Sequence, residues 1–153
     1  MEIPVFGKEQ YPLNRESGLS YTISDIYKHV PIHTHTHYEL FIISDGAAYH
    51  MINDSVQTVR KGDLFFIRPN DMHSYNFYHS ENFCVRNLGF STQVLRNVSL
   101  FLEQEEKMDK LINSEMPAYV HLEGENFLKV LDALDTAGKL VNSSHPRHAR
   151  YHA

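Results

Sequence analysis

Up to about residue 90, apolar and polar positions alternate or gather in short apolar runs, and turn residues interrupt them. Tyr38–Ile43 forms one such run, Asp45-Gly46 ends it, and Ala47–Ile52 begins the next. Asn53-Asp54 then predicts a tight hairpin turn, because both residue types tolerate a positive φ. Short strands with a turn about every 8–12 residues are typical of a β-sandwich or barrel. We therefore predict mainly β structure for this part of the chain.

From Ser91 onward the apolar residues recur at spacings of 3, 4 and 7, which predicts one amphipathic helix over about residues 91–113. Ser91 or Thr92 is the predicted N-cap. Residues 118–122 are expected to form one more strand, and a second amphipathic helix follows over residues 123–142. A β-rich part followed by two helices indicates a barrel with a helical appendage and not alternating βαβ units.

The composition limits the class of protein and its compartment. A chain of 153 residues corresponds to one domain. Its 14 Lys and Arg against 19 Asp and Glu give a net charge of -5, so we expect no large basic face for DNA. Neither a signal peptide nor an apolar stretch long enough to span a membrane is visible. The single Cys84 fits a reducing compartment. We therefore predict a cytoplasmic location.

Histidine is unusually frequent, with 11 copies, and the densest group lies within Pro31–Glu39. Side chains alternate between the two faces of an extended segment. Four side chains that can ligate metals are therefore expected on one face: His33, His35, His37 and Glu39. Imidazole and carboxylate groups together suit Zn, Ni, Fe or Mn. A further ligand can come from Gly62–Asn76, because a strand after a proline turn can lie beside the first strand in a closed sheet.

These two stretches resemble the two sequence motifs of the cupins. The first is a His-x-His-x-x-x-Glu block, and the second is a Gly-Asp block that ends in Pro-x-Asp-x-His. The resemblance implies a small jelly-roll barrel. It also implies the ligand set of metal-binding cupins, which corresponds here to His33, His35, Glu39 and His73. The alternative is a polar, hydrogen-bonded barrel mouth that holds no metal.

A longer series of motifs resembles the N-terminal effector-sensing domain of AraC-type bacterial transcription regulators. It comprises Pro-x-His-x-His-x-x-x-Glu-Leu, a glycine-containing hairpin, Gly-Asp-Leu-Phe-Phe-Ile, Pro-x-Asp-x-His-Ser-Tyr, and Val85–Ser91 before a helix. The series extends over about residues 20–142. The resemblance implies a small-molecule effector in the barrel and dimerisation through the closing helix. The apolar stripe of that helix consists of Phe127, Val130, Leu131, Leu134, Leu140 and Val141. The alternative is that this stripe packs on the core of the same chain.

One part of such regulators has no counterpart in these 153 residues. AraC-type proteins contact DNA through a C-terminal pair of helix-turn-helix units, which this sequence lacks. Its absence agrees with the acidic balance of charge. We expect either an excised sensor domain or a free-standing relative.

Several aromatic and polar residues of the predicted strands are candidates for lining a ligand pocket: His37, Tyr38, Tyr49, Phe66, Arg68 and Tyr75. Pockets of this composition suit a carbohydrate or an aromatic effector. For His37, a role in shaping the pocket is favoured over a role as an extra metal ligand. For Arg68, the alternative to binding an anion or hydroxyl group is an ordinary surface charge. The remaining histidines, including His50, His79 and His121, are expected to be hydrogen-bonded or exposed.

The favoured function is a sensing and dimerisation domain for a small molecule, plausibly a sugar. In this reading, residues 1–18 form an arm that can close over the barrel, residues 19–122 form the barrel with its helix, and residues 143–153 form a linker or tail. The second hypothesis is a small metal-dependent cupin enzyme, such as a dioxygenase, isomerase or epimerase. It is disfavoured because no second acid–base pair is evident near the motif. A purely structural dimerisation module is a third hypothesis.

Overall fold

The structure is a computed structural model of the chain. It describes residues 2–6, 12–26, 29–77, 82–141 and 147–150. His79, His145 and His152 lie outside these residues, as do parts of the expected arm and tail.

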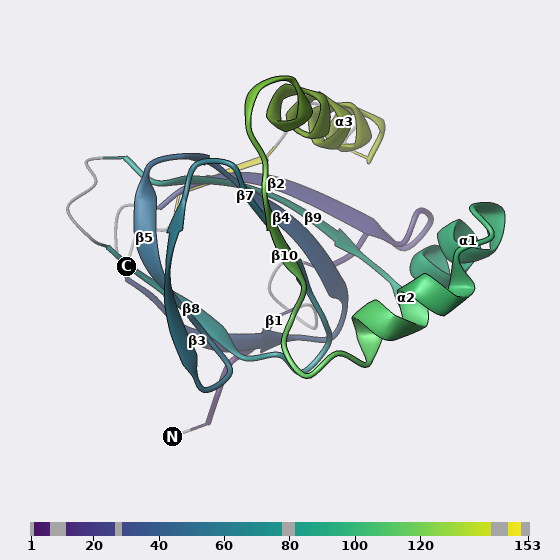
Figure 1. Ribbon diagram of the computed structural model, residues 1–153, viewed down its shortest axis with the longest axis horizontal. Helices are drawn as coiled ribbons and strands as arrows, with labels where there is room; N and C mark the ends of the chain where they lie inside the picture. The colour runs from purple at the N-terminus through teal and green to yellow at the C-terminus, as the bar shows by residue number, and fades with distance from the viewer. Residues whose placement is uncertain (1, 7–11, 27–28, 78–81, 142–146, 151–153) are drawn as a thin grey trace.

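Two β-sheets face each other and wind around a common interior (Figure 1). The five-stranded sheet has the order β1-β3-β8-β5-β6, with these bounds: β1 Val5–Phe6, β3 Val30–His35, β8 His73–Phe77, β5 Ala47–Ile52 and β6 Ser55–Arg60. The six-stranded sheet has the order β10-β7-β4-β9-β2-β11, with these bounds: β10 Tyr119–His121, β7 Asp63–Ile67, β4 Tyr38–Asp45, β9 Cys84–Phe90, β2 Leu19–Asp25 and β11 Arg147–Arg150. This arrangement confirms the expected mainly β, jelly-roll-like fold.

Strand β4 is buried on both of its faces, which explains its continuous apolar sequence. Phe41 and Ile43 belong to the core inside the barrel. Tyr38 and Ile42 belong to two separate clusters on the outer face, beneath the helices. Because side chains alternate along a strand, β4 contributes to three apolar clusters at once.

The predicted turns have the backbone conformations that their residues favour. Asn53, between β5 and β6, has a φ of 50°. Gly62, between β6 and β7, has a φ of 97°, and an added Cβ would overlap the carbonyl oxygen of Leu122. Glycine is therefore required at position 62 for both conformation and space.

The structure contains three helices in the described residues, where the sequence analysis expected two. The segment predicted as a single helix over about 91–113 is divided into α1, Thr92–Phe101, and α2, Glu105–Ile112. Glu103 has a φ of 53°, a left-handed conformation that a continuing helix cannot accept. Ser91 is the N-cap of α1, and its Oγ accepts a hydrogen bond from the Val94 amide.

The last helix, α3, spans Gly124–Val141 and lies over the outer face of the six-stranded sheet (Figure 1). Its buried Phe127 and Leu134 form a cluster with Tyr21 and Ile42 of the sheet, and Val130 and Leu131 pack against that cluster. Most of the stripe expected to dimerise is therefore covered by the barrel of the same chain. Leu140 is different, because 82% of it is exposed.

Part of the expected tail forms a strand. Arg147–Arg150 forms β11, which pairs in parallel with β2 at the edge of the six-stranded sheet. The sequence contains no strand pattern there, so this pairing was not predicted. Among the described residues, no helix is both long and apolar enough to cross a membrane.

Candidate functional site

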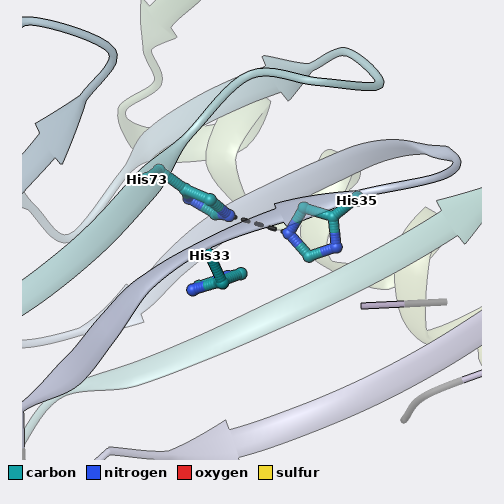
Figure 2. A group of neighbouring side chains, drawn as sticks. All are labelled: His33, His35 and His73. Atoms are coloured by element: carbon teal, nitrogen blue, oxygen red, sulfur yellow. Dashed lines mark hydrogen bonds between the residues drawn. The ribbon is translucent and has the colours of Figure 1, made fainter. Parts of the chain in front are cut away.

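Four ligand-type side chains from three strands converge inside the barrel. His33 and His35 lie on β3, Glu39 lies on β4, and His73 begins β8. Strands β3 and β8 are paired with His33 opposite His73, which brings the two sequence motifs together. Figure 2 shows the three imidazoles facing one another. All four side chains are buried, with exposed fractions of 4% or less.

The ring and carboxylate atoms that face one another lie within a few ångströms. His35 Nε2 is 2.8 Å from His73 Nε2, as the dashed line in Figure 2 marks. Glu39 Oε2 is 3.2 Å from His35 Nε2 and 3.9 Å from His73 Nε2. One ligand atom from each of His33, His35 and His73 lies within 4.8 Å of the others. The structure thus brings together all four residues of the predicted ligand set.

Groups outside this cluster form hydrogen bonds with two of its members. These bonds involve the side-chain atoms that point away from the other ligand-type residues. His33 Nδ1 is 2.8 Å from the carbonyl oxygen of Pro31, which can only accept a hydrogen bond. The proton of His33 therefore lies on Nδ1, and Nε2 keeps a free lone pair. Asn87 Nδ2 donates to Glu39 Oε1 at 3.0 Å. Glu39 Oε2 has no hydrogen-bond partner among the described residues.

The cluster carries a buried negative charge among neutral rings. Burial lowers the pKa of His35 to about 4 and the pKa of His73 well below its ordinary value, and it also lowers the pKa of His33. Burial alone would raise the pKa of Glu39, but His35, His37 and the Asn87 hydrogen bond hold it below its ordinary value. Near neutral pH the site therefore contains one carboxylate and unprotonated imidazoles.

These properties fit a divalent transition metal. An ionised carboxylate in the interior is costly unless a cation compensates it, and the unpaired Glu39 Oε2 is such a group. Neutral imidazole nitrogens and a carboxylate oxygen are ligands for Zn, Ni, Fe and Mn. His33, His35, Glu39 and His73 would hold the metal, which would supply a Lewis-acidic centre with room for further ligands.

A small cavity adjoins the cluster, with a volume of about 50 Å³. The inward face of β2 lines it with three hydroxyl side chains, Ser20, Thr22 and Ser24, and Asn87 of β9 lies opposite Thr22 in the strand register. Sequence reasoning missed these residues. The alternating sequence of β2 could have identified them, because its polar residues face the interior while Tyr21 and Ile23 face α3.

Phe6 closes the cavity on another side. Its ring stacks on His33 with centroids 4.3 Å apart, and it meets His35 edge-on at 5.7 Å. Strand β1 carries this residue and pairs in parallel with β3 through two residue pairs, Val5 with Thr34 and Phe6 with His35. The described part of the expected arm thus reaches the barrel interior.

Of the six residues predicted for the pocket, His37 and Tyr75 line the cavity. Tyr38 and Phe66 instead stack on each other beneath α1, on the outer face of the sheet. Tyr49 faces outward on β5, and 37% of it is exposed. These three placements correct the sequence expectation, and the reason is strand parity, because each residue lies one position away from an inward-facing neighbour.

Arg68 is a structural residue outside the cavity. Its guanidinium donates to both carboxylate oxygens of Asp71, at 2.9 and 3.0 Å. It also donates to the carbonyl oxygens of Ile112 and Ser114, which follow or end α2. Arg68 therefore links the turn before β8 to the end of α2 through hydrogen bonds. It is neither a ligand group of the cavity nor a free surface charge.

His37 lines the same cavity as His33, His35, Glu39 and His73. Its Nε2 is 3.6 Å from Glu39 Oε1, and its Nδ1 has no hydrogen-bond partner among the described residues. Gly89 makes room for the ring, because an added Cβ would lie 2.9 Å from His37 Nε2. His37 could join His35 and Glu39 in a second group of metal-ligating atoms.

Two of the remaining histidines have specific partners. His121 has Nδ1 2.6 Å from Asp63 Oδ1 and Nε2 3.1 Å from Glu123 Oε1, as expected of a hydrogen-bonded histidine. His50 lies inside the barrel, fully buried, with Nε2 3.3 Å from His73 Nδ1. It was not part of the predicted site. The sequence could have placed His50 inside the barrel, because Ala48 and Ile52 share its face of β5 and belong to the core.

Acid should destabilise the folded chain, because its buried histidines accept protons more readily after unfolding. Burial lowers the pKa of His35 to about 4 and that of His50 to about 3, against about 6.5 in an unfolded chain. Between these values the unfolded chain binds more protons. The free energy of unfolding should therefore fall as the pH drops from about 6.5 to 4, by about 1.4 kcal/mol per pH unit for each histidine.

Urea titrations of the metal-free chain between about pH 7 and 4.5 measure this slope. His50→Phe lacks one of the groups and should show a smaller slope than the wild type. A urea midpoint that stays constant over this range would contradict the presence of neutral, buried histidines.

Comparison with known proteins decides the family. Residues 20–134 match the profile of the AraC-like ligand binding domain. The chain belongs to this family. The HTH-type transcriptional activator RhaS of Klebsiella pneumoniae (strain 342) is 32% identical over 81 residues. RhaS of Escherichia coli O81 (strain ED1a) is 31% identical over 80 residues. Each alignment covers 50% of this chain and 28% of the relative.

Solved structures agree on the fold. Apo ToxT from Vibrio cholerae strain SCE256, a single-residue variant, superposes with a TM-score of 0.63 at 13% identity. The match covers 81% of this chain and 48% of the ToxT chain. At this identity the likeness shows a shared fold. The described domain thus corresponds to part of larger proteins, and it is an AraC-type ligand-binding domain with a jelly-roll-like barrel.

Proposed function

We propose that this chain is the sensing domain of a cytoplasmic transcription regulator and that its effector is a small polyhydroxylated molecule, such as a sugar. The observation that carries this proposal is the polar face of β2, with Ser20, Thr22 and Ser24 in the cavity. Asn87 Oδ1 and His37 Nδ1 are buried beside them without hydrogen-bond partners among the described residues. Sugar hydroxyls can both donate to such atoms and accept from the serine and threonine hydroxyls.

The barrel must open to admit this effector. Its cavity of about 50 Å³ is far smaller than the roughly 300–1,000 Å³ of typical small-molecule pockets. Strand β1 is the element best suited to move, because it has two residues and pairs with β3 through two residue pairs. Short, partly exposed elements open at low free-energy cost.

The proposed function includes a divalent transition metal at His33, His35, Glu39 and His73. The buried carboxylate charge and the neutral imidazoles support it, as does the convergence of their inner atoms. The metal lies next to the hydroxyl-lined face, so an effector in the cavity would reach both. Binding of the effector to the open and closed states with different affinities would then provide the signal.

The assembled regulator would act as a homodimer and contact DNA through a helix-turn-helix part outside these residues. Leu128 and Leu140 on the exposed side of α3 are 61% and 82% exposed, and they support dimerisation through this side of the helix. Val141, at the end of α3, is half-buried and adjoins Leu140. The relatives' description as HTH-type transcriptional activators supports the regulatory role.

The second candidate function is a metal-dependent cupin enzyme, and the histidine–glutamate cluster is the observation that favours it. The two functions differ in turnover. The sensor returns a bound sugar unchanged, whereas the enzyme converts it. Chromatography that resolves sugar isomers, coupled to mass spectrometry, separates them when it is applied to the sugar after prolonged incubation with the metal-loaded chain.

Phe6→Ala should strengthen effector binding, because it removes the ring that closes the barrel over His33. If the open form is a minor state of about 10% or less, a substitution that makes it the main state raises the apparent affinity for the effector about tenfold or more. A thermal-shift screen of pentoses and hexoses against the metal-loaded wild type and Phe6→Ala tests both this prediction and the proposed function. Binding raises the melting temperature by mass action.

Val5→Ala is the matched control, because Val5 lies on the same short strand but does not line the cavity. It should bind sugars as the wild type does. The absence of any sugar-dependent shift in both the wild type and Phe6→Ala would refute a sugar effector. Equal sugar affinities in the two proteins would refute the closing role of Phe6.

A further inference from the structure

We propose that His50 is a positioning residue for the metal centre, which fixes the proton and the ring orientation of His73. This inference rests on the proposed metal site, and it adds a residue that lies outside the predicted ligand set. His50 is on β5 and His73 is on β8, two strands that are paired in the five-stranded sheet. Both side chains are buried inside the barrel.

The geometry assigns different roles to the two nitrogens of His73. Its Nε2 faces the cluster, 2.8 Å from His35 Nε2 and 3.9 Å from Glu39 Oε2. Its Nδ1 faces away, 3.3 Å from His50 Nε2. Coordination through Nε2 requires a lone pair there, so the proton of neutral His73 must be on Nδ1. His50 Nε2 is placed to accept that proton in a hydrogen bond.

The same arrangement occurs at two other members of the cluster. The Pro31 carbonyl accepts from His33 Nδ1, and Asn87 donates to Glu39 Oε1. In each case the atom that points away from the cluster forms a hydrogen bond with a neighbouring group. The other nitrogen or oxygen of the same side chain would be available to the metal. His50 provides the corresponding support for His73, because its Nε2 lies 3.3 Å from His73 Nδ1.

The surroundings of His50 argue against a role in packing alone. Its ring is fully buried, stacks on Tyr75 at 4.9 Å and meets Phe65 edge-on at 5.0 Å. A phenylalanine would fill such an apolar position. Histidine instead leaves its own Nδ1 buried without a hydrogen-bond partner in the described part of the chain. A buried unpaired nitrogen is unfavourable, so the useful atom is Nε2.

The test is the affinity of the full chain for Zn²⁺, measured by competition with a chelating dye. His50→Phe keeps the aromatic stacking and removes the acceptor, and it should weaken Zn²⁺ binding by about 10–100-fold, the usual effect of losing an outer-shell partner. His50→Gln supplies an amide oxygen that can accept from His73 Nδ1, so it should restore most of the affinity. Met51→Leu, on the outer face of the same strand, is the control and should bind as the wild type does.

The visible absorption bands of the Co²⁺-loaded chain provide a second readout, because they report ligand geometry. They should change in His50→Phe and return toward the wild-type pattern in His50→Gln. Equal Zn²⁺ affinity in wild type and His50→Phe would overturn the role of His50 while leaving the metal site intact. Equal weakening in both variants, with both folded by circular dichroism, would show packing and overturn the hydrogen bond. A wild-type chain that binds no Zn²⁺ would overturn the metal site itself.

Discussion

Glu39→Gln should lose metal binding while the metal-free chain stays folded. The substitution removes the buried carboxylate charge but keeps an oxygen that can accept from Asn87. Removing one partner of a buried charge pair usually costs about 3–5 kcal/mol, so the affinity for a divalent metal should fall by at least ~100-fold. In the absence of metal the variant should stay folded, because glutamine keeps the shape of the glutamate side chain and the Asn87 hydrogen bond. Elemental analysis and chelator competition on untagged protein measure the first effect, and urea denaturation measures the second.

Histidines of the C-terminal segment, such as His148, can bind metal adventitiously, and the same comparison controls for this. The wild type and Glu39→Gln share that segment, so only the difference in metal content belongs to the barrel. Glu106→Gln, on the exposed side of α2, should retain the wild-type metal content. If Glu39→Gln retains as much metal as the wild type, then the carboxylate is not a ligand.

Gly138→Ala should destabilise the fold strongly, although alanine is ordinarily the better helix former by about 1 kcal/mol. Gly138 is buried in α3, and an added Cβ would overlap the ring of Tyr21. The Tyr21 hydroxyl donates to Asp135, which also pairs with Arg86, so the ring has little freedom to move away. Overpacking of this kind usually costs about 1–3 kcal/mol, and more where the neighbours are fixed.

The midpoint of urea denaturation measures this change. Thr136→Ala, on the exposed side of the same helix, is the matched control and should be neutral or slightly stabilising. Because the apolar residues beneath α3 would be partly uncovered, Gly138→Ala should also bind a hydrophobic dye more strongly. A variant as stable as the wild type would contradict the close contact between α3 and β2.

Strand parity explains which site residues the sequence could predict. The ligand set is predictable because His33, His35 and Glu39 share one parity and the motif order places His73 beside them. Tyr38 and Phe66 could not be placed in the same way. Their strands are apolar on both faces, since helices cover the outside of the sheet, and the pattern alone does not say which face is inside.

Other features depend on contacts that leave little trace in the sequence. Strand β1 has two residues, too few for a period to be visible, yet it brings Phe6 against His33 of the histidine–glutamate cluster. The stripe of α3 predicts a buried face, but a stripe does not distinguish the barrel of the same chain from a partner subunit. Gly138 carried a signal, because a glycine inside a helix usually marks a close approach.

The central claim is that the hydroxyl-lined face of β2 binds a sugar inside the barrel. Isothermal titration of the full, metal-loaded chain with pentoses and hexoses tests it most directly, with wild type beside Thr22→Val. This substitution keeps the shape of the side chain and removes one hydroxyl from the cavity. The account predicts that at least one sugar binds the wild type and binds Thr22→Val about tenfold or more weakly, as the loss of a buried hydrogen bond implies. Binding of no sugar, or equal binding by both proteins, would contradict it.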